Sequence, residues 1–413
     1  MGGRNLLGAN GMKILALIAL FAAASDTAML GVRPAWLVDQ MAEGPLKDEL
    51  LACIDEPLPS TDWSIGHRGA PLQFPEHSRQ SYIAAARQGA GIIECDVTFT
   101  KDRQLVCRHA QCDLHRTTDI LIRPELAAKC RVPFTAATDD APASATCCAS
   151  DLTVSEFKLL NAKMDSFDPT AKTAEAAMGG NPTWRTEAYN PGEVLTHSEA
   201  IALIQSFGRK HTPELKSPEV AMPFDGPYTQ EDYASALIAD YVSAGVSPED
   251  VYPQSFDLND VLYWIDTYPE FGRQAVFLDP RGDAGALDPN KPSTFSPSME
   301  ELHDRGVRII APPLWMLLTL NDGRIAPSAY AQSAKTAGLD VIAWTVERSG
   351  TLADSGGYYF QSVAEAIDGP GDLMTVLDVL YTDIGVRGVF SDWPATTTFF
   401  AGCKARHEAE GLD

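Results

Sequence analysis

Two pairs of charged residues stand inside apolar runs of this sequence, where a charge needs a compensating partner. Glu94 and Asp96 are two positions apart in one run, and Glu214 and Lys216 have the same spacing in another. Residues two apart in a β-strand point to the same side, so each pair presents two charged groups on one face. We therefore expect both runs to be strands that carry chemistry as well as packing.

Three carboxylates on neighbouring strands repel one another unless a cation lies among them. Oxygen ligands of this kind are the ones that Mg²⁺ and Ca²⁺ prefer. We predict that Glu94, Asp96 and Glu214 bind one divalent cation, either Mg²⁺ or Ca²⁺. The alternative is an ion-pair network without metal, in which Arg68 and Lys216 neutralise the acids.

Two of the eight histidines are placed to flank such a site. His67 ends the first apolar run, and His109 follows the short run 105–107, which a turn at 101–102 would fold back over the Glu94 strand. Histidine exchanges protons near neutral pH, so we predict that His67 and His109 act as acid and base. No place at the site is predicted for the other six, which are His77, His115, His197, His211, His303 and His407.

Short apolar runs alternate with amphipathic helical stretches along most of the chain. Eight strands are predicted, at 63–67, 91–98, 212–216, 251–256, 275–278, 307–311, 341–346 and 388–391. Such alternation predicts a parallel sheet with right-handed crossovers, and eight units predict an α/β fold, the closed (β/α)8 TIM barrel. A doubly wound open sheet is the alternative, although no glycine-rich phosphate fingerprint follows the first strand.

The predicted site residues stand where barrel enzymes do their chemistry, at the carboxyl ends of the strands. Besides the acids and histidines, Gln254 and Phe256 end the fourth predicted strand, and Trp344 lies near the end of the seventh. The two aromatic residues could wall a substrate pocket or simply pack at the barrel mouth.

The segment from about 112 to 196 breaks the alternation, since it has no clear strand and is rich in Cys, Thr, Ala, Asp and Pro. It is too long for a simple loop. We interpret it as a disulfide-pinned, Cys-rich insertion between strands 2 and 3 of a barrel that spans 61–402. The other predicted parts are a signal peptide (1–25), a lead-in (26–60) and a tail (403–413).

The N-terminus is typical of an export signal. Arg4 and Lys13 precede an apolar run at 14–24, and small residues follow at 22–25. The run is short for a bilayer span, which favours a cleaved signal over an anchor or a buried helix. We predict an exported protein, periplasmic or secreted, with no stable membrane insertion after cleavage.

Eight cysteines agree with export, because an even number in an exported chain indicates disulfides. The predicted pairs are Cys107 with Cys112, Cys130 with Cys147 or Cys148, and Cys53 with Cys403. A zinc site is the alternative, but the sequence contains no CxxC pair.

The charge balance excludes one class of partner. With 56 acidic and 32 basic residues the formal net charge is −24, which opposes binding to nucleic acid. An anionic substrate would therefore need a local cation at the site, such as a metal ion with a few Arg and Lys residues.

In order along the chain, these motifs resemble those of the glycerophosphodiester phosphodiesterases. They are His67-Arg68-Gly69, Pro75-Glu76-His77-Ser78, Glu94-x-Asp96-Val97 with Thr100-Lys101-Asp102, Val106 to His109, Pro213-Glu214-Leu215-Lys216, Gln254-Ser255-Phe256 and Trp344-Thr345-Val346. The matches run from about 64 to 394, which makes the combination specific.

The resemblance implies a barrel with a segment inserted after its second strand, and metal-dependent hydrolysis of a small glycerophosphodiester to sn-glycerol 3-phosphate and an alcohol. It implies that His67 and His109 are catalytic, that Glu94, Asp96 and Glu214 bind the metal, and that Arg68 and Lys216 bind phosphate. Gln254, Phe256 and Trp344 are expected to contact substrate.

The motifs depart from the family pattern at His77, where Asn is usual, and at Ala110, where Asp is frequent. Glu76 is interpreted as serving the start of the following helix, where acids are favoured, and the alternative is that it supports residues of the site from behind. Two other functions stay open: a phospholipase D-like or sphingomyelinase-like lipid phosphodiesterase on the same barrel, and an inactive secreted binding protein.

Overall fold

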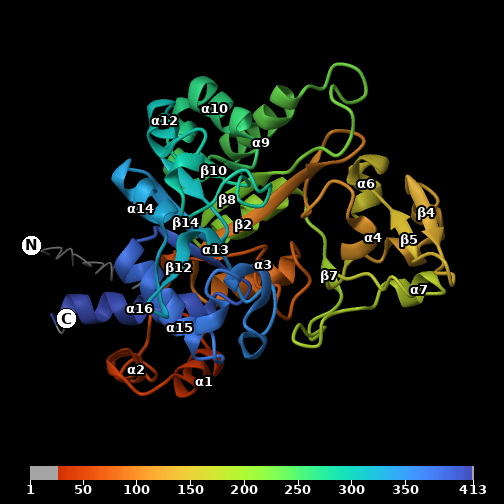
Figure 1. Cartoon of the computed structure of the whole chain (residues 1–413). Helices are drawn as coiled ribbons and strands as arrows, with labels where there is room; N and C mark the ends of the chain where they lie inside the picture. Colours follow the sequence, from red (N-terminus) through yellow and green to blue (C-terminus); the bar gives the residue numbers. More distant parts are fainter. Residues whose placement is uncertain (1–26, 412–413) are drawn as a thin grey trace, which may run out of the picture.

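The computed structural model describes residues 27–411, so the predicted signal peptide lies outside the described residues. Eight parallel strands form a closed barrel (Figure 1), because β1 pairs with β15 on one side and with β2 on the other. The strands are β1 (Thr61–Gly66), β2 (Ala90–Phe99), β8 (Lys210–Leu215), β9 (Gln254–Ser255), β10 (Val276–Leu278), β11 (Ile309–Ala311), β14 (Asp340–Val346) and β15 (Gly388–Ser391). The predicted barrel is confirmed, and its closure excludes the open sheet.

Helices cover the outside of the barrel between successive strands (Figure 1). They include α3 (Arg79–Arg87), α8 (His197–Ser206), α9 (Gln230–Ala244), α10 (Leu258–Thr267), α12 (Met299–Asp304), α14 (Ala329–Thr336), α15 (Asp372–Asp378) and α16 (Ala395–Glu410). Several begin at a Ser or Thr that accepts a hydrogen bond from the third helical N–H, as Thr196 does for α8 and Thr229 for α9. These caps fix where each helix starts after its loop.

The inner face of the barrel changes character along the strands. Its lower part is a compact apolar cluster, with members such as Ile65 on β1, Ile92 on β2 and Phe390 on β15. His67 and Glu94 lie two positions beyond Ile65 and Ile92, so the same face becomes charged at the carboxyl ends. The apolar layer thus supports a polar layer above it.

Strand register brings the acids side by side. In the parallel pair β2–β8, Asp96 is aligned with Glu214, and Glu94 with Thr212. Glu214 is in turn aligned with Gln254 on β9. Because β2 is buried along its whole length, these side chains cannot turn away to solvent.

The chain leaves the barrel after β2. The short strand β3 (Leu105–Cys107) pairs antiparallel with β2, as the predicted hairpin requires. The following segment, 112–196, lies beside the barrel and has its own apolar cluster, which includes Leu121, Phe157 and Leu160 (Figure 1). Its elements are α4 (Leu114–Thr117), α5 (Pro124–Ala127), β4 (Val132–Thr135), β5 (Ser144–Thr146), α6 (Val154–Phe157), β6 (Asn161–Ala162), α7 (Ala174–Ala177) and β7 (Gly192–Glu193).

The expectation that this segment lacks strands is wrong, since it contains the antiparallel pairs β4–β5 and β6–β7. These strands have two to four residues, and most of their side chains are at least partly exposed. Elements this short and this polar leave no apolar alternation to be read from a sequence.

Four disulfides link all eight cysteines: Cys53–Cys403, Cys95–Cys107, Cys112–Cys148 and Cys130–Cys147. The first and last confirm predicted pairs, with Cys147 as the partner of Cys130. The predicted Cys107–Cys112 pair is wrong, because the β2–β3 hairpin brings the Cα of Cys107 to 5.5 Å from that of Cys95.

The lead-in folds against the end of the chain. Its helices α1 (Arg33–Asp39) and α2 (Pro45–Leu51) both contact α16, to which the Cys53–Cys403 bond also ties it. No helix within 27–411 has both the length and the apolar character needed to cross a bilayer.

Candidate active site

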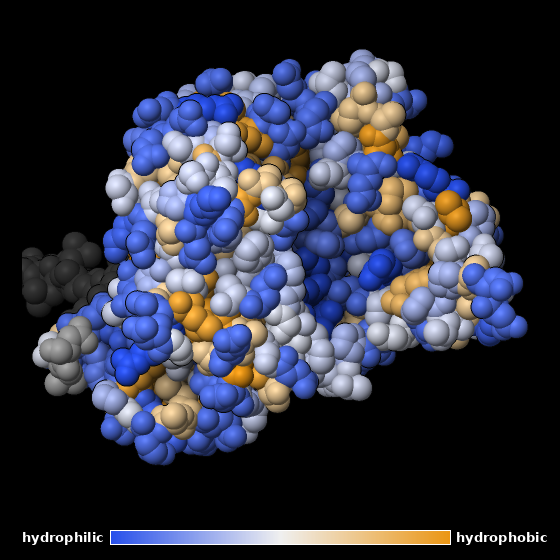
Figure 2. Space-filling view, viewed as in Figure 1, coloured by the Kyte–Doolittle hydropathy of each residue, from blue (hydrophilic) through white to orange (hydrophobic). Residues whose placement is uncertain are grey.

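A pocket of about 100 Å³ opens at the carboxyl ends of the barrel strands. Figure 2 shows a hollow between the barrel and the 112–196 segment in which hydrophilic residues predominate. Eight of the predicted site residues line the pocket, namely His67, Arg68, Glu94, His109, Glu214, Lys216, Phe256 and Trp344. Asp96 and Gln254 are buried and contact the lining residues. The structure therefore brings the whole predicted set together.

The three acids form one cluster, in which a carboxylate oxygen of each lies within 4.8 Å of the others. Glu94 accepts hydrogen bonds from the Arg68 N–H (2.9 Å) and from Gln254 Nε2 (2.9 Å). Asp96 Oδ1 is buried and has no hydrogen-bond partner. Hard oxygen ligands with an unpaired carboxylate oxygen fit a divalent cation such as Mg²⁺ or Ca²⁺.

The electrostatics of the cluster also favour a cation. Burial, with the charges of Asp96 and Glu214, raises the pKa of Glu94 well above its usual value. Burial raises the pKa of Glu214 to about 8. The pKa of Asp96 is lowered despite burial, because Lys216 and His77 stabilise its charge. The cluster thus resists holding three negative charges unless a further positive charge joins it.

His67 is held by a carboxylate on the last barrel strand. Its Nδ1 lies 2.6 Å from Asp392 Oδ1, one residue beyond β15, and its Nε2 lies 3.8 Å from Glu94 Oε2. Burial and the neighbouring Arg68 lower the pKa of His67 to about 4, so its ring is neutral at pH 7. With Asp392 as acceptor, Nδ1 carries the proton and Nε2 offers its lone pair to the pocket.

His109 faces the same pocket from the β3 side and also lines an adjoining pocket of about 220 Å³. The backbone N–H of Arg108 donates to the Asp96 carbonyl (2.8 Å), which holds this turn against β2. Burial, Arg68 and Lys216 lower the pKa of His109 well below its usual value. The two histidines therefore enter the pocket from different strands.

The two predicted cations contact the acids. Arg68 donates from Nη1 to Glu76 Oε2 (2.9 Å), and its Nε lies 3.4 Å from Asp96 Oδ2. Lys216 Nζ lies 2.5 Å from Glu214 Oε1 and 5.7 Å from the centre of the Phe256 ring. These contacts offset part of the negative charge, as the ion-pair alternative predicts, and they also place both cations at the pocket.

A family model described as the glycerophosphoryl diester phosphodiesterase family matches residues 67–396. The chain belongs to this family.

The chain is also similar to individual proteins. A protein named "Extracellular protein" from Arthroderma benhamiae is 43% identical over 246 residues, which are 58% of this chain and 99% of that one. A glycerophosphodiester phosphodiesterase of Bacillus subtilis is 41% identical over 56 residues, which are 14% of this chain and 19% of that one.

Solved structures show the same fold. A structure from Silicibacter pomeroyi has a TM-score of 0.54 at 18% identity and covers 84% of this chain and 95% of its own. A phosphodiesterase of Oleispira antarctica, solved with the product sn-glycerol-3-phosphate, has a TM-score of 0.50 at 18% identity and covers 83% of this chain and 97% of its own.

In this member of the glycerophosphoryl diester phosphodiesterase family, Glu76 does not serve the start of the following helix, so that interpretation is wrong. Helix α3 begins at Arg79 and is capped by Ser78. Glu76 is buried and instead accepts hydrogen bonds from Arg68 and from Arg348 Nη2 (2.8 Å). It orients Arg68 at the pocket and does not cap the helix.

Sequence reasoning missed three groups around the site: Asp392, Arg348 and His77. Asp392 stands one residue after a predicted strand, which was the signal available for finding it. Arg348 donates to Asp392 Oδ2 (3.1 Å) and to Asp165 Oδ2 (2.9 Å) as well as to Glu76, so only the fold reveals its role. His77, for which no place at the site was predicted, lies 2.8 Å from Asp96 Oδ2 through its Nε2.

The aromatic residues form a wall of the pocket. Phe256 and Trp344 meet edge to face with ring centres 5.7 Å apart, and Tyr359 also packs edge to face with Trp344 at 5.8 Å. Trp344 is fixed by a hydrogen bond from its Nε1 to the Ala311 carbonyl (2.7 Å).

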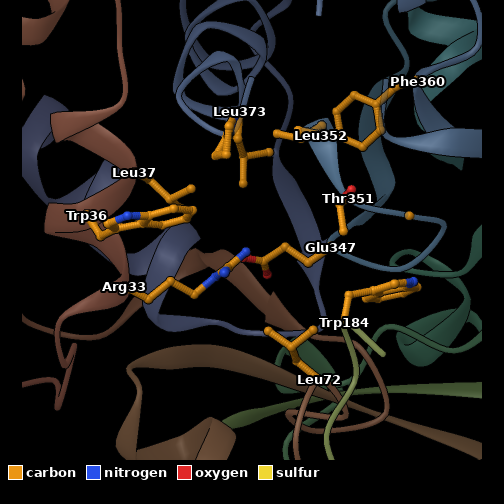
Figure 3. Close-up of a pocket in the computed structure, with 12 residues that line it drawn as sticks. Arg33, Trp36, Leu37, Leu72, Trp184, Glu347, Thr351, Leu352, Phe360 and Leu373 are labelled. Atoms are coloured by element: carbon orange, nitrogen blue, oxygen red, sulfur yellow. The ribbon is translucent and has the colours of Figure 1, made fainter. Parts of the chain in front are cut away.

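A second, more apolar pocket of about 150 Å³ is lined in part by Glu347 and Thr351, which follow β14 (Figure 3). Trp36 and Trp184 stand on opposite sides of an ion pair between Arg33 Nε and Glu347 Oε1 (2.9 Å). None of the predicted site residues lines this pocket.

Proposed function

We propose that this chain hydrolyses glycerophosphodiesters to sn-glycerol 3-phosphate and an alcohol, by acid-base catalysis at a metal-dependent site. One observation carries the proposal: two histidines and three carboxylates converge on one pocket of a barrel of this family. The glycerol phosphate product held by the Oleispira antarctica phosphodiesterase supports this class of substrate.

The metal would be held by Glu94, Asp96 and Glu214, whose oxygen ligands suit Mg²⁺ or Ca²⁺. When bound there, a divalent cation supplies positive charge to the phosphoryl oxygens. Arg68 and Lys216 bind the phosphate beside it and stabilise the negative charge that develops in the transition state. An acidic protein thereby holds an anionic substrate.

His67 is the base of the proposed reaction. Its Nε2 removes the proton of the nucleophile, which is water or the glycerol 2-hydroxyl, and Asp392 stabilises the imidazolium that forms. His109 is the acid: it takes up a proton when the anionic phosphate is bound beside it and passes that proton to the leaving oxygen of the alcohol. Phe256 and Trp344 wall the glycerol side of the pocket, while Gln254 holds the Glu94 carboxylate.

Neither alternative function gains support from the structure. A lipid phosphodiesterase needs an apolar rim at the barrel mouth, whereas hydrophilic residues predominate in the hollow there (Figure 2). An inactive binding protein would not require two histidines, three carboxylates and two cations in one pocket.

We also propose that the chain is exported, to a periplasm or the extracellular medium, after removal of residues 1–25. The four disulfides indicate an oxidising compartment, and the Arthroderma benhamiae relative is named an extracellular protein.

The function is tested with glycerophosphocholine as substrate and release of glycerol phosphate as the readout. His67→Ala and His109→Ala should each reduce turnover by at least about 10²-fold, because each removes a proton-transfer group. EDTA should abolish turnover, and Mg²⁺ or Ca²⁺ should restore it.

His303→Ala, which changes a half-exposed histidine on α12, serves as the control and should retain full turnover. Near-complete activity of both catalytic variants would refute the assigned roles, and insensitivity to EDTA would refute the metal requirement.

A further inference from the structure

His77 is buried directly beneath the acid cluster, in a backbone conformation that its surroundings impose. Its φ of 53° lies in the left-handed region, which only a few per cent of residues other than glycine adopt. Its N–H donates to the Arg68 carbonyl (3.1 Å), and its carbonyl accepts from Arg108 Nη2 (3.0 Å). The main chain at His77 is therefore fixed between two parts of the site.

Both ring nitrogens of His77 have specific partners. Nε2 lies 2.8 Å from Asp96 Oδ2, and Nδ1 lies 2.9 Å from the Tyr82 hydroxyl on α3. A carboxylate can only accept a hydrogen bond, so Nε2 carries the proton and Nδ1 accepts from the Tyr82 O–H. Asp96 thereby fixes the tautomer, and the Tyr82 hydroxyl supports it by donating to Nδ1.

The bond to His77 occupies one oxygen of Asp96 and leaves the other without a partner. Asp96 is 1% exposed and His77 is 0% exposed, so water does not compete for either group. Asp96 Oδ1 is one of the buried oxygens of the site that accept no hydrogen bond, with Glu214 Oε1 and Gln254 Oε1. A carboxylate held by one oxygen presents the other in a fixed direction, which is the state required of a monodentate metal ligand.

We propose that His77 is a positioning residue of the metal site, which fixes the Asp96 carboxylate so that Oδ1 is free for the cation, with the Tyr82 hydroxyl supporting the tautomer of His77. The proposal rests on the metal-dependent function proposed above. It assigns a purpose to His77, one of the two positions at which the motifs depart from the pattern that they resemble. Loss of such a supporting group typically weakens metal binding by about 10–100-fold.

The test measures metal binding directly. Metal-free protein is titrated calorimetrically with Ca²⁺ alone and with Mg²⁺ alone, and the apo protein is checked for its melting temperature. His77→Phe removes the donor and should weaken binding by about 10-fold or more. His77→Gln has the same backbone strain but keeps an N–H that can reach Asp96, so it should retain most of the affinity.

Two further variants separate positioning from packing. Tyr82→Phe keeps the ring but removes the hydroxyl that donates to His77 Nδ1, and it should weaken binding by a few-fold. His211→Phe replaces another buried histidine, which packs on Tyr241 on the outer side of β8, and it should leave metal affinity unchanged.

The outcomes are distinguishable. Equal affinity of wild type, His77→Phe and Tyr82→Phe would overturn the role of His77 while leaving the metal site in place. If wild type bound neither ion, the proposed metal site itself would fall. If His77→Phe did not fold, the comparison of His77→Gln and Tyr82→Phe with wild type would still decide the matter, since unchanged affinity in Tyr82→Phe contradicts the proposal.

Discussion

Asp392 gives His67 a defined tautomer, and that contact joins the two ends of the barrel sheet. The carboxylate lies just after the last strand, and the histidine just after the first, 2.6 Å apart. Because β1 pairs with β15, the closure of the barrel is what brings the two residues together.

Asp392→Asn tests this contact at the scale of one residue. An amide can donate to Nδ1 and so stabilise the wrong tautomer, which should reduce turnover of glycerophosphocholine by about 10²–10⁴-fold. Binding of the metal should change little, since Asp392 is not among the three clustered acids. Asp139→Asn, at an exposed position of the 112–196 segment, is the control, and equal turnover of both variants would contradict the role of Asp392.

His211 makes stability depend on pH. It is 1% exposed, neither ring nitrogen has a hydrogen-bond partner, and burial lowers its pKa from 6.5 to about 3. Below about pH 6.5, His211 is protonated in the unfolded chain but stays neutral in the folded protein. The free energy of unfolding therefore falls as the pH drops towards 3. At pH 5 this residue alone should cost about 2 kcal/mol relative to pH 7.5.

Urea unfolding of wild type and His211→Phe at pH 7.5 and pH 5 measures this effect. The variant should lose about 2 kcal/mol less between the two pH values. His303→Phe should behave as wild type, and parallel losses in wild type and His211→Phe would show that His211 does not cause the dependence.

At the scale of elements, a chain of ion pairs ties the 112–196 segment to the catalytic layer. Arg348, on the loop after β14, contacts Glu76, Asp392 and Asp165. Asp165 belongs to the segment and also accepts from Arg185 Nη2 (2.5 Å). The segment thus reaches His67 through two intermediates, Arg348 and Asp392.

Asp165→Asn should loosen this connection. Two largely buried guanidinium groups would each lose a charged partner, which should lower the free energy of unfolding by about 1–3 kcal/mol. With Arg348 less restrained on Asp392, turnover should fall by several-fold. Denaturant unfolding and steady-state kinetics measure both, with Asp139→Asn again as the control. Unchanged stability and turnover would show that the segment does not support the site.

The elements also show what could be predicted from the sequence. Barrel strands are local apolar runs, and their ends carry the acids, so strands and acid cluster were both predictable. His77, Asp392 and Arg348 act through partners that are 19, 325 and up to 272 residues away, and the one local signal for them was the position of Asp392 at a strand end. The Cys95–Cys107 bond was hidden for a related reason, because Cys112 is nearer to Cys107 in sequence than Cys95 is.

At the scale of the whole molecule, one barrel supplies both stability and chemistry from the same inner face. Apolar side chains fill its lower half, and the charged cluster occupies its upper half. The outer segment with its own apolar cluster adds one wall of the hollow above the site (Figure 2).

The Cys53–Cys403 bond has a mechanical consequence. It joins residues 350 positions apart and makes the barrel, with its inserted segment, one covalent ring. Tension applied to the two termini of the oxidised protein passes through the sulfur atoms and bypasses the strands. A translocating enzyme that pulls one end of the polypeptide through a narrow pore would meet a closed loop. Two segments of the backbone would then have to pass through the pore side by side until a reductant broke the Cys53–Cys403 bond.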